Sequence, residues 1–195
     1  MKKLFEGLEE NDIVVTGNGS ACVVSFQAAE IKKGQRLFTN SGCASMGYGL
    51  PAALGACIAE GEKRVICLDG DGSLMMNLQE LQTIRYNNCN MKLFVLNNNG
   101  YHSIRQTQNN LFKNGLIGVC DGNGVNFPPF DKLADTFGFK YFKIDSLDGI
   151  EEKLQEVLNT DGPVLCEAIL DEAQNFAPKL SSKVLPDGKI VSPPI

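Results

Sequence analysis

Four short polar segments of this chain, each of which follows an apolar run, carry residue types that could together bind a metal ion and an anion. The four segments combine glycine with Asn, Asp or Ser, and they are residues 16–20, 39–47, 69–73 and 97–101. Glycine lets a backbone approach a ligand closely, whereas the other three residue types supply oxygen atoms. Such segments favour a polar ligand with several oxygens that is held together with a hard cation.

The segment at residues 69–73, Asp-Gly-Asp-Gly-Ser, follows a strand-like run and precedes a helix-like one. Asn77 and Glu80 stand where a helix cap and its partner in a capping box would stand. Backbone amides and the dipole at a helix start hold phosphate oxygens, and a carboxylate such as Asp71 holds the cation that bridges them. The segment therefore predicts a site for a diphosphate and a metal ion.

Three other ligand-binding motifs fail on individual residues. In an EF-hand that began at Asp69, the glycine required at position six would be Leu74. A phosphate-binding P-loop needs Lys after its second glycine, but residues 42–47 are followed by Tyr48. A dinucleotide fingerprint that began at residue 17 would need a third glycine where Cys22 stands.

Strand and helix patterns alternate along the chain and must position these segments. Short apolar runs predict strands at residues 13–15, 36–38, 65–68, 92–96 and 164–166. Amphipathic stretches predict helices at residues 20–32, 50–60, 78–88, 129–137 and 147–159. This alternation predicts an α/β fold with a three-layer, doubly wound, mainly parallel sheet. Ligands bind such sheets beyond the carboxyl ends of the strands, which is where the polar segments lie.

The 195 residues are enough for one domain with a filled core, which we place at residues 1–172. Residues 173–195 contain four prolines and lack helical or strand periodicity, so an irregular tail is expected there. Residues 110–128 are rich in Gly and Asn. They predict either a mobile loop that closes over the site or a plain surface connection.

Charge, cysteine usage and hydropathy exclude several classes of protein. The formal net charge of −5 comes without a cluster of Lys or Arg, so no nucleic-acid partner is expected. The seven Cys residues include no CxxC pair, which indicates buried thiols in a reducing compartment. No apolar run reaches the length of a signal or membrane-spanning segment, so we expect a cytoplasmic protein with no membrane partner.

One long motif connects two of the polar segments. Gly70-Asp71-Gly72 is followed by 24 residues and then by Asn97-Asn98. This pattern resembles the signature of thiamine-diphosphate-dependent enzymes. Residues 46–56, Met-Gly-Tyr-Gly-Leu-Pro-Ala-Ala-Leu-Gly-Ala, and the helix-like residues 77–85 are similar to segments of the acetolactate-synthase-like family. The resemblance covers roughly residues 8–170 and implies the carboxyl-terminal, diphosphate-binding domain of such an enzyme.

The resemblance implies the role of each site residue. Magnesium would be bound by side-chain oxygens of Asp71 and Asn98 and by the carbonyl of Gly100. Met46 would be the apolar wedge that bends thiamine diphosphate, although its residue type also fits ordinary core packing. The carbonyl of Ala44 would accept a hydrogen bond from the aminopyrimidine. The cofactor-binding residues are Gly19, Ser20, Ala44, Ser45, Met46, Asp71, Gly72, Ser73, Asn98, Tyr101 and His102.

The chain's single histidine admits two roles. His102 would contact the diphosphate region through its backbone, or its ring would transfer a proton, because histidine titrates near neutral pH. Asp69 is expected at the strand end, behind the metal ligands. The chain has Arg105-Gln106-Thr107 in a region where acetolactate synthases tend to carry Trp, and it has no Trp. The substrate is therefore assigned only as a 2-oxo acid.

The family's activating glutamate comes from a separate pyrimidine-binding domain, usually of another subunit, and we find no counterpart of it here. We therefore expect the carboxyl-terminal domain of a thiamine-diphosphate-dependent 2-oxo acid decarboxylase or carboligase, in a homodimer or higher oligomer. One alternative is the small subunit of a two-chain decarboxylase that resembles the sulfopyruvate and phosphonopyruvate enzymes. The other is a module that only binds the cofactor and has no catalytic role.

Overall fold

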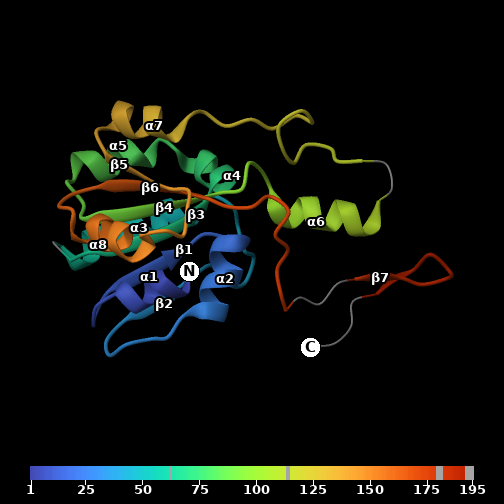
Figure 1. The fold of residues 1–195 in the computed structure, drawn as a ribbon, viewed down its shortest axis with the longest axis horizontal. Coiled ribbons are helices and arrows are strands. Elements are labelled where there is room, and N and C mark those ends of the chain that lie inside the picture. Colours follow the sequence, from blue (N-terminus) through green and yellow to red (C-terminus); the bar gives the residue numbers. More distant parts are fainter. Residues whose placement is uncertain (62, 113–114, 179–181, 192–195) are drawn as a thin grey trace.

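A computed structural model describes residues 1–61, 63–112, 115–178 and 182–191. Its main sheet contains the strands β1 (Ile13–Thr16), β2 (Arg36–Phe38), β3 (Val65–Gly70), β4 (Met91–Asn97), β5 (Lys140–Ile144) and β6 (Val164–Ile169). The strands are ordered β2-β1-β3-β4-β6-β5, and each neighbouring pair runs parallel (Figure 1). Parallel strands need crossover connections, and helices supply them.

Helices cover both faces of this sheet (Figure 1). One face packs against α1 (Lys2–Gly7), α2 (Ser20–Ala28) and α8 (Ile150–Asn159). The other packs against α3 (Gly49–Glu60), α5 (Glu80–Tyr86) and α7 (Phe130–Phe137). Along β3, Val65 and Cys67 enter one core and Ile66 and Leu68 enter the other, as the alternation of a pleated strand requires. The predicted three-layer, doubly wound α/β fold is confirmed.

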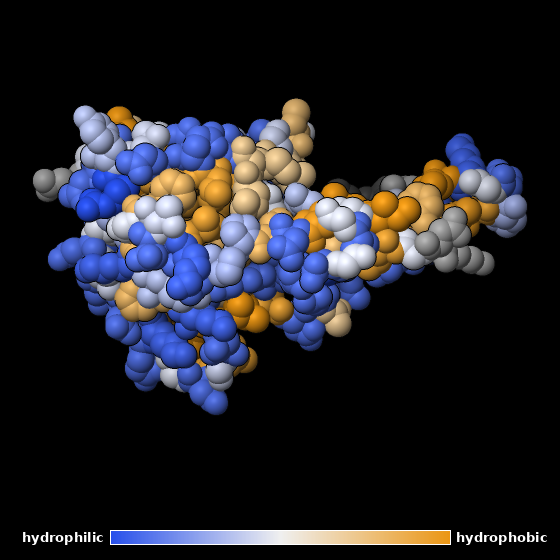
Figure 2. Space-filling view, turned by 90° about the horizontal axis from the view of Figure 1, so that it is seen from above, coloured by the Kyte–Doolittle hydropathy of each residue, from blue (hydrophilic) through white to orange (hydrophobic). Residues whose placement is uncertain are grey.

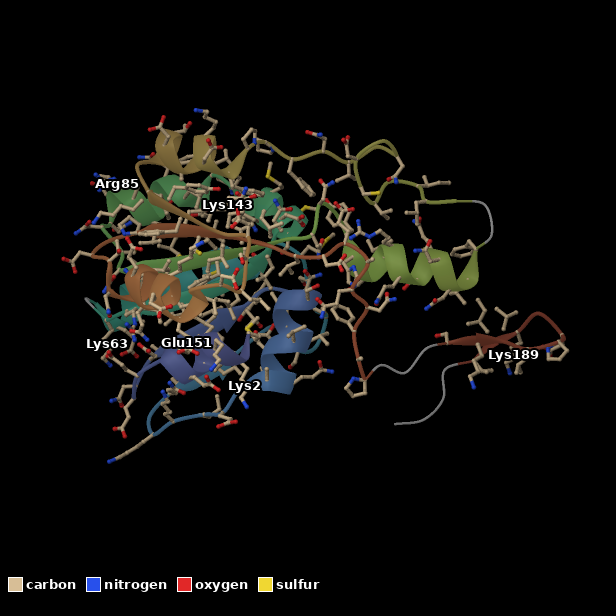
Figure 3. The ribbon with its side chains drawn as sticks, in the orientation of Figure 1. Lys2, Lys63, Arg85, Lys143, Glu151 and Lys189 are labelled. Carbon is tan, nitrogen blue, oxygen red and sulfur yellow. The ribbon has the colours of Figure 1, made fainter. Side chains whose placement is uncertain are left out.

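Charged side chains lie around the outside of these layers. The outer surfaces of α1 and α8 are joined by an ion pair in which Lys3 Nζ lies 2.7 Å from Glu151 Oε1. Figure 3 labels Glu151 on α8, at the outside of the layers. Both side chains are about half exposed or more, so the pair adds little to the free energy of unfolding. This exposed ion pair therefore contributes much less to stability than the burial of the two apolar cores.

One strand of the main sheet and one long helix were not predicted from the sequence. Strand β5 lies at the edge of the sheet, so its residues are only partly buried and show little apolar periodicity. Helix α6 (His102–Leu111) buries His102, Arg105 and Gln106, which are all polar. A search for apolar periodicity therefore could not find it.

The helix after β3 also begins earlier than expected. A short helix, α4 (Asp71–Leu74), and a 3-10 turn (Met75–Asn77) precede α5. The interpretation of Asn77 as a helix cap was wrong, because its Nδ2 atom donates to the carbonyl of Gly47 at 2.7 Å. Asn77 instead fixes the loop that carries Met46.

The carboxyl-terminal segment leaves the body of the molecule beside α6 (Figure 1). It was expected to be irregular, but it contains a small antiparallel hairpin of β7 (Lys183–Val184) and β8 (Ile190–Val191). Figure 2 shows apolar side chains on this projecting side of the molecule. Phe112, which follows α6, Ile117 and Val184 of β7 are exposed. Within the described ranges, no helix has the length and apolar character needed to cross a membrane.

Candidate functional site

The strands β1, β3 and β4 lie side by side, so the loops that follow them meet at one edge of the sheet. The helices after β1 and β3 lie on opposite faces of the sheet, and this arrangement opens a crevice between the two loops. A cavity of about 290 Å³ occupies that position. Its lining residues are Asn18, Gly19, Ser20, Ala44, Met46, Gly70, Asp71, Gly72, Ser73, Asn98, Gly100, Tyr101, His102, Ser103 and Ile104.

The structure brings nearly all of the predicted site residues to this cavity. Ser45 is the exception: its Oγ accepts a hydrogen bond from Asn40 Nδ2 at 3.2 Å, and it does not line the cavity. The predicted site residues did not include four residues of the lining, which are Asn18, Gly70, Ser103 and Ile104. Asn18 was available as an oxygen donor inside a polar segment, whereas Ser103 and Ile104 belong to the first turn of α6, which was not predicted.

Asp71 connects the loop after β3 to the loop after β4. Its Oδ1 accepts the amide of Gly72 at 2.7 Å, and its Oδ2 accepts the amides of Asn98 at 3.2 Å and Gly100 at 3.0 Å. Burial raises the pKa of Asp71 to about 6, although these hydrogen bonds act in the opposite direction. A nearby cation would favour the ionised form of this carboxylate.

The side-chain oxygen of Asn98 adds a second oxygen ligand suited to such a cation. Asn98 Oδ1 is buried and has no hydrogen-bond partner among the described residues. A buried polar atom without a partner is costly unless something binds it. Carboxylate, amide and carbonyl oxygens are the ligands that magnesium prefers, so Asp71, Asn98 and the carbonyl of Gly100 fit this ion.

The residues around this position do not form a metal site by themselves. The described part of the chain has no group of three or more His, Cys, Asp or Glu side chains that could hold a metal ion. Magnesium keeps six ligands and commonly takes several from substrate phosphates or water. An ion held by Asp71 and Asn98 would therefore bind together with a phosphate-bearing ligand.

Two helix amino-termini meet at the cavity and provide for that ligand. Helix α2 begins after Gly19 and helix α6 begins after Tyr101, and both residues line the cavity. The first amides of a helix lack partners within the helix and carry a partial positive charge, so they bind phosphate oxygens. Gly72 keeps this region tight, because a Cβ atom there would lie 2.2 Å from Cε1 of Tyr101.

The loop that carries Met46 is held by hydrogen bonds to Ser73 and Asn77. Gly47 has φ +77°, its amide donates to Ser73 Oγ at 3.0 Å, and its carbonyl accepts Asn77 Nδ2. Met46 is 37% exposed and lines the cavity. This exposure separates Met46 from the two apolar cores and leaves its side chain available to a ligand.

Asp69 has a structural position, as expected for a residue at the end of a strand. It is fully buried, and its Oδ1 accepts the amide of Gly70 at 2.9 Å. A Cβ atom on Gly17 would lie 2.0 Å from Oδ1, and one on Gly49 would lie 2.7 Å from Oδ2. Burial raises the pKa of Asp69 to about 6. Asp69 therefore packs the first loop against the start of α3.

The sequence matches the protein family described as "Thiamine pyrophosphate enzyme, C-terminal TPP binding domain" over residues 17–168. The chain belongs to this family. The match includes the loops after β1, β3 and β4 and the helices α2 and α6 that surround the cavity.

Curated relatives of this thiamine-pyrophosphate-binding domain include large subunits of acetolactate synthases. Isozyme 1 of Escherichia coli K12 is 30% identical over 171 residues, and isozyme 2 is 33% identical over 178 residues. Acetolactate synthase 1 of Nicotiana tabacum, a chloroplastic protein, is 32% identical over 176 residues. The alignments cover 88%, 91% and 88% of this chain but only 30%, 32% and 26% of these relatives. The chain therefore corresponds to about a third of their length or less.

Two buried carboxyls of this thiamine-pyrophosphate-binding domain, those of Asp69 and Asp71, predict an unusual dependence of stability on pH. A pKa raised on folding contributes stability that is present below the unfolded value, near 4, and is lost as the pH rises through about 6. The ligand-free chain should therefore gain about 1–3 kcal/mol in its free energy of unfolding from these groups between pH 7.5 and pH 5. Urea denaturation in EDTA at both pH values measures it.

The variant Asp69→Asn provides the control for this prediction. Its amide keeps the hydrogen bond from Gly70 but cannot titrate, so about half of the pH dependence should disappear. An unchanged pH dependence in the variant would contradict the assignment to the buried carboxyls.

Proposed function

We propose that the chain is the domain that binds the diphosphate of thiamine diphosphate through Mg²⁺ in an enzyme that decarboxylates or joins 2-oxo acids. The observation that carries the magnesium assignment is the buried, unpartnered Oδ1 of Asn98 in the same cavity as the Asp71 carboxylate. The amino-termini of α2 and α6 at that cavity support the diphosphate assignment. When bound, the cofactor supplies the electron sink for cleavage of the bond beside the 2-oxo group.

The residues of this chain would bind and orient the cofactor. Asp71, Asn98 and the carbonyl of Gly100 would hold the magnesium ion, and the ion would hold the diphosphate. The exposed Met46 would support the bent shape of the cofactor from the side of the cavity. Ala44 has φ +49° and lines the same cavity, so its carbonyl is the proposed acceptor for the aminopyrimidine.

Proton transfer on the aminopyrimidine would depend on a partner. Asp71 is the only carboxylate among the described residues that line the cavity, and it is committed to three backbone amides. We therefore propose that a pyrimidine-binding domain or subunit supplies the activating glutamate. Met46, Met76 and Ile104 present exposed apolar surface that such a partner would cover, in a dimer or a higher oligomer.

A calorimetric titration of the chain with thiamine diphosphate, with Mg²⁺ or with EDTA, tests this function. We expect weak binding that requires Mg²⁺ and that is lost when thiamine, which has no diphosphate, replaces the cofactor. NMR should show no acceleration of proton exchange at C2 of the cofactor by the chain alone. Binding of equal strength in EDTA would overturn the magnesium assignment, and accelerated exchange would overturn the need for a partner.

A further inference from the structure

Arg105 is a buried cation next to the proposed metal site. The residue is only 7% exposed, although it carries a permanent charge. Its Nη2 atom donates to the carbonyl of Asn98 at 3.0 Å and to the carbonyl of Glu172 at 3.4 Å. Its Nη1 atom lies 3.7 Å from Oε2 of Glu172. Burial of a guanidinium is expensive unless such partners compensate, so this arrangement requires a reason.

Arg105 and Asp71 bind opposite ends of the Asn98 backbone. The amide of Asn98 donates to Asp71, and its carbonyl accepts from Arg105. The backbone of Asn98 is therefore held at both ends, while its side-chain Oδ1 is left without a partner among the described residues. This geometry orients the oxygen that we assign to magnesium.

Glu172 belongs to a segment that lies along α6, and we call residues 172–176 the strap. Three buried residues on one face of α6 contact it, because positions i, i+3 and i+4 of a helix share a face. The Arg105 guanidinium contacts Glu172, the Gln106 amide donates to Asn175 Oδ1, and the ring of His102 lies edge-on to Phe176 at 5.1 Å. Figure 1 shows the chain leave β6 and pass the first turns of α6.

The strap and the loop after β4 also share an anchor in the sheet. Strands β4 and β6 are neighbours, with Asn97 opposite Ile169. The amide of Leu170 donates to the carbonyl of Asn97 at 2.8 Å. We call residues 97–100 the metal loop. The chain just before the strap is hydrogen-bonded to this loop at Asn97, and Arg105 links the strap to the loop a second time, by donating to both Glu172 and Asn98.

We propose that Arg105 is a positioning residue that couples the strap to the metal loop and holds Asn98 in the orientation needed to bind Mg²⁺. The proposal rests on the proposed function, because it assigns the purpose of this geometry to the magnesium site. The strap thereby becomes part of the cofactor site although no strap residue lines the cavity.

The shape of the guanidinium explains why arginine stands at this position. Its Nη2 atom donates to two carbonyls while Nη1 lies near a carboxylate, and the planar guanidinium fixes these two nitrogens relative to each other. A lysine ammonium is instead a compact charge at the end of a flexible stem. A lysine at position 105 would keep the charge but could not reproduce the fixed geometry. Arg105→Lys should therefore lie between the wild type and Arg105→Met in each measurement below.

The first measurement is hydrogen exchange of the ligand-free chain, followed by mass spectrometry of peptides that cover the metal loop. Arg105→Met should raise the exchange rate of the amides of Asn98 and Gly100 about tenfold, because local opening becomes easier, while exchange in β1 and β3 stays unchanged. Arg36→Met is the matched control, since it removes an exposed guanidinium from the edge strand β2. It should leave the metal loop unchanged.

The second measurement is the Mg²⁺ concentration needed for half-maximal binding of thiamine diphosphate. Arg105→Met should raise it about tenfold, in the range found when partners behind metal ligands are removed. Excess Mg²⁺ should restore binding, which would not happen if the substitution merely unfolded the domain. Glu172→Gln keeps both carbonyl contacts and loses the ionic one, so it should shift the requirement in the same direction by less.

Each outcome decides a separate claim. An unchanged exchange rate in the metal loop of Arg105→Met, or an unchanged Mg²⁺ requirement, would overturn the role of Arg105. If Arg105→Met exchanges rapidly throughout the sheet and is therefore unfolded, Arg105→Lys and Glu172→Gln decide the role in the same two measurements. A wild-type chain that binds no Mg²⁺ with the cofactor would instead refute the proposed function, while the exchange experiment would still report whether Arg105 holds the loop.

Discussion

Replacing Asp71 with alanine is expected to reduce Mg²⁺-dependent binding of thiamine diphosphate more than about a hundredfold. The substitution removes the one carboxylate of the described cavity lining, and hard cations depend on charged oxygen ligands. The chain should stay folded because two effects on stability oppose each other. The amides of Gly72, Asn98 and Gly100 lose an acceptor, at about 1–3 kcal/mol for each donor left unpaired, but an ionised carboxylate no longer has to be buried.

Calorimetry and a thermal melt of the same sample separate these effects for Asp71→Ala. The matched control is Asp135→Ala, which removes an exposed carboxylate from α7 and should leave binding and melting unchanged. If Asp71→Ala binds the cofactor as the wild type does and still responds to Mg²⁺, the metal site lies elsewhere. If it fails to fold, Asp71 is primarily a structural link between the loops after β3 and β4.

The second large effect is expected for Gly100→Ala. Gly100 has φ +145°, which side chains rarely adopt, and a Cβ atom there would lie 2.1 Å from the carbonyl oxygen of Val119 and 3.1 Å from Cα of Cys120. Both obstacles are backbone atoms, so the loop would have to move. The free energy of unfolding should fall by more than about 2 kcal/mol. The magnesium requirement should rise as well, because the amide of Gly100 would leave Asp71.

Urea denaturation measures the stability change of Gly100→Ala. Gly55→Ala is the control, because nothing lies within 4 Å of the added Cβ atom and the residue is inside α3, where alanine is favoured over glycine by about 1 kcal/mol. It should leave stability unchanged or raise it. Equal stabilities for Gly100→Ala and the wild type would show that the contact of Gly100 with Val119 and Cys120 is readily remodelled.

The sequence alone determined those parts of the molecule that depend on neighbouring residues. Buried strands such as β3 and β4 are apolar runs, and their connecting helices show apolar faces, so the alternation revealed the layers of the fold. The glycine and acidic residues at 69–73 indicated a diphosphate and metal site because loop chemistry is local. Nearly every cofactor residue implied by the family resemblance lines the cavity.

The tertiary structure decided the parts whose surroundings come from distant residues. Helix α6 buries polar residues, and one of the two acceptors of Arg105 is the carbonyl of Glu172, which is 67 residues away in the chain. Strand β5 and Asn77 were misread for the same reason: β5 takes its place from β6, and Asn77 contacts Gly47, 30 residues away. A polar group is buried only when a partner compensates for lost hydration, and no pattern of neighbouring residues reveals a partner so far along the chain.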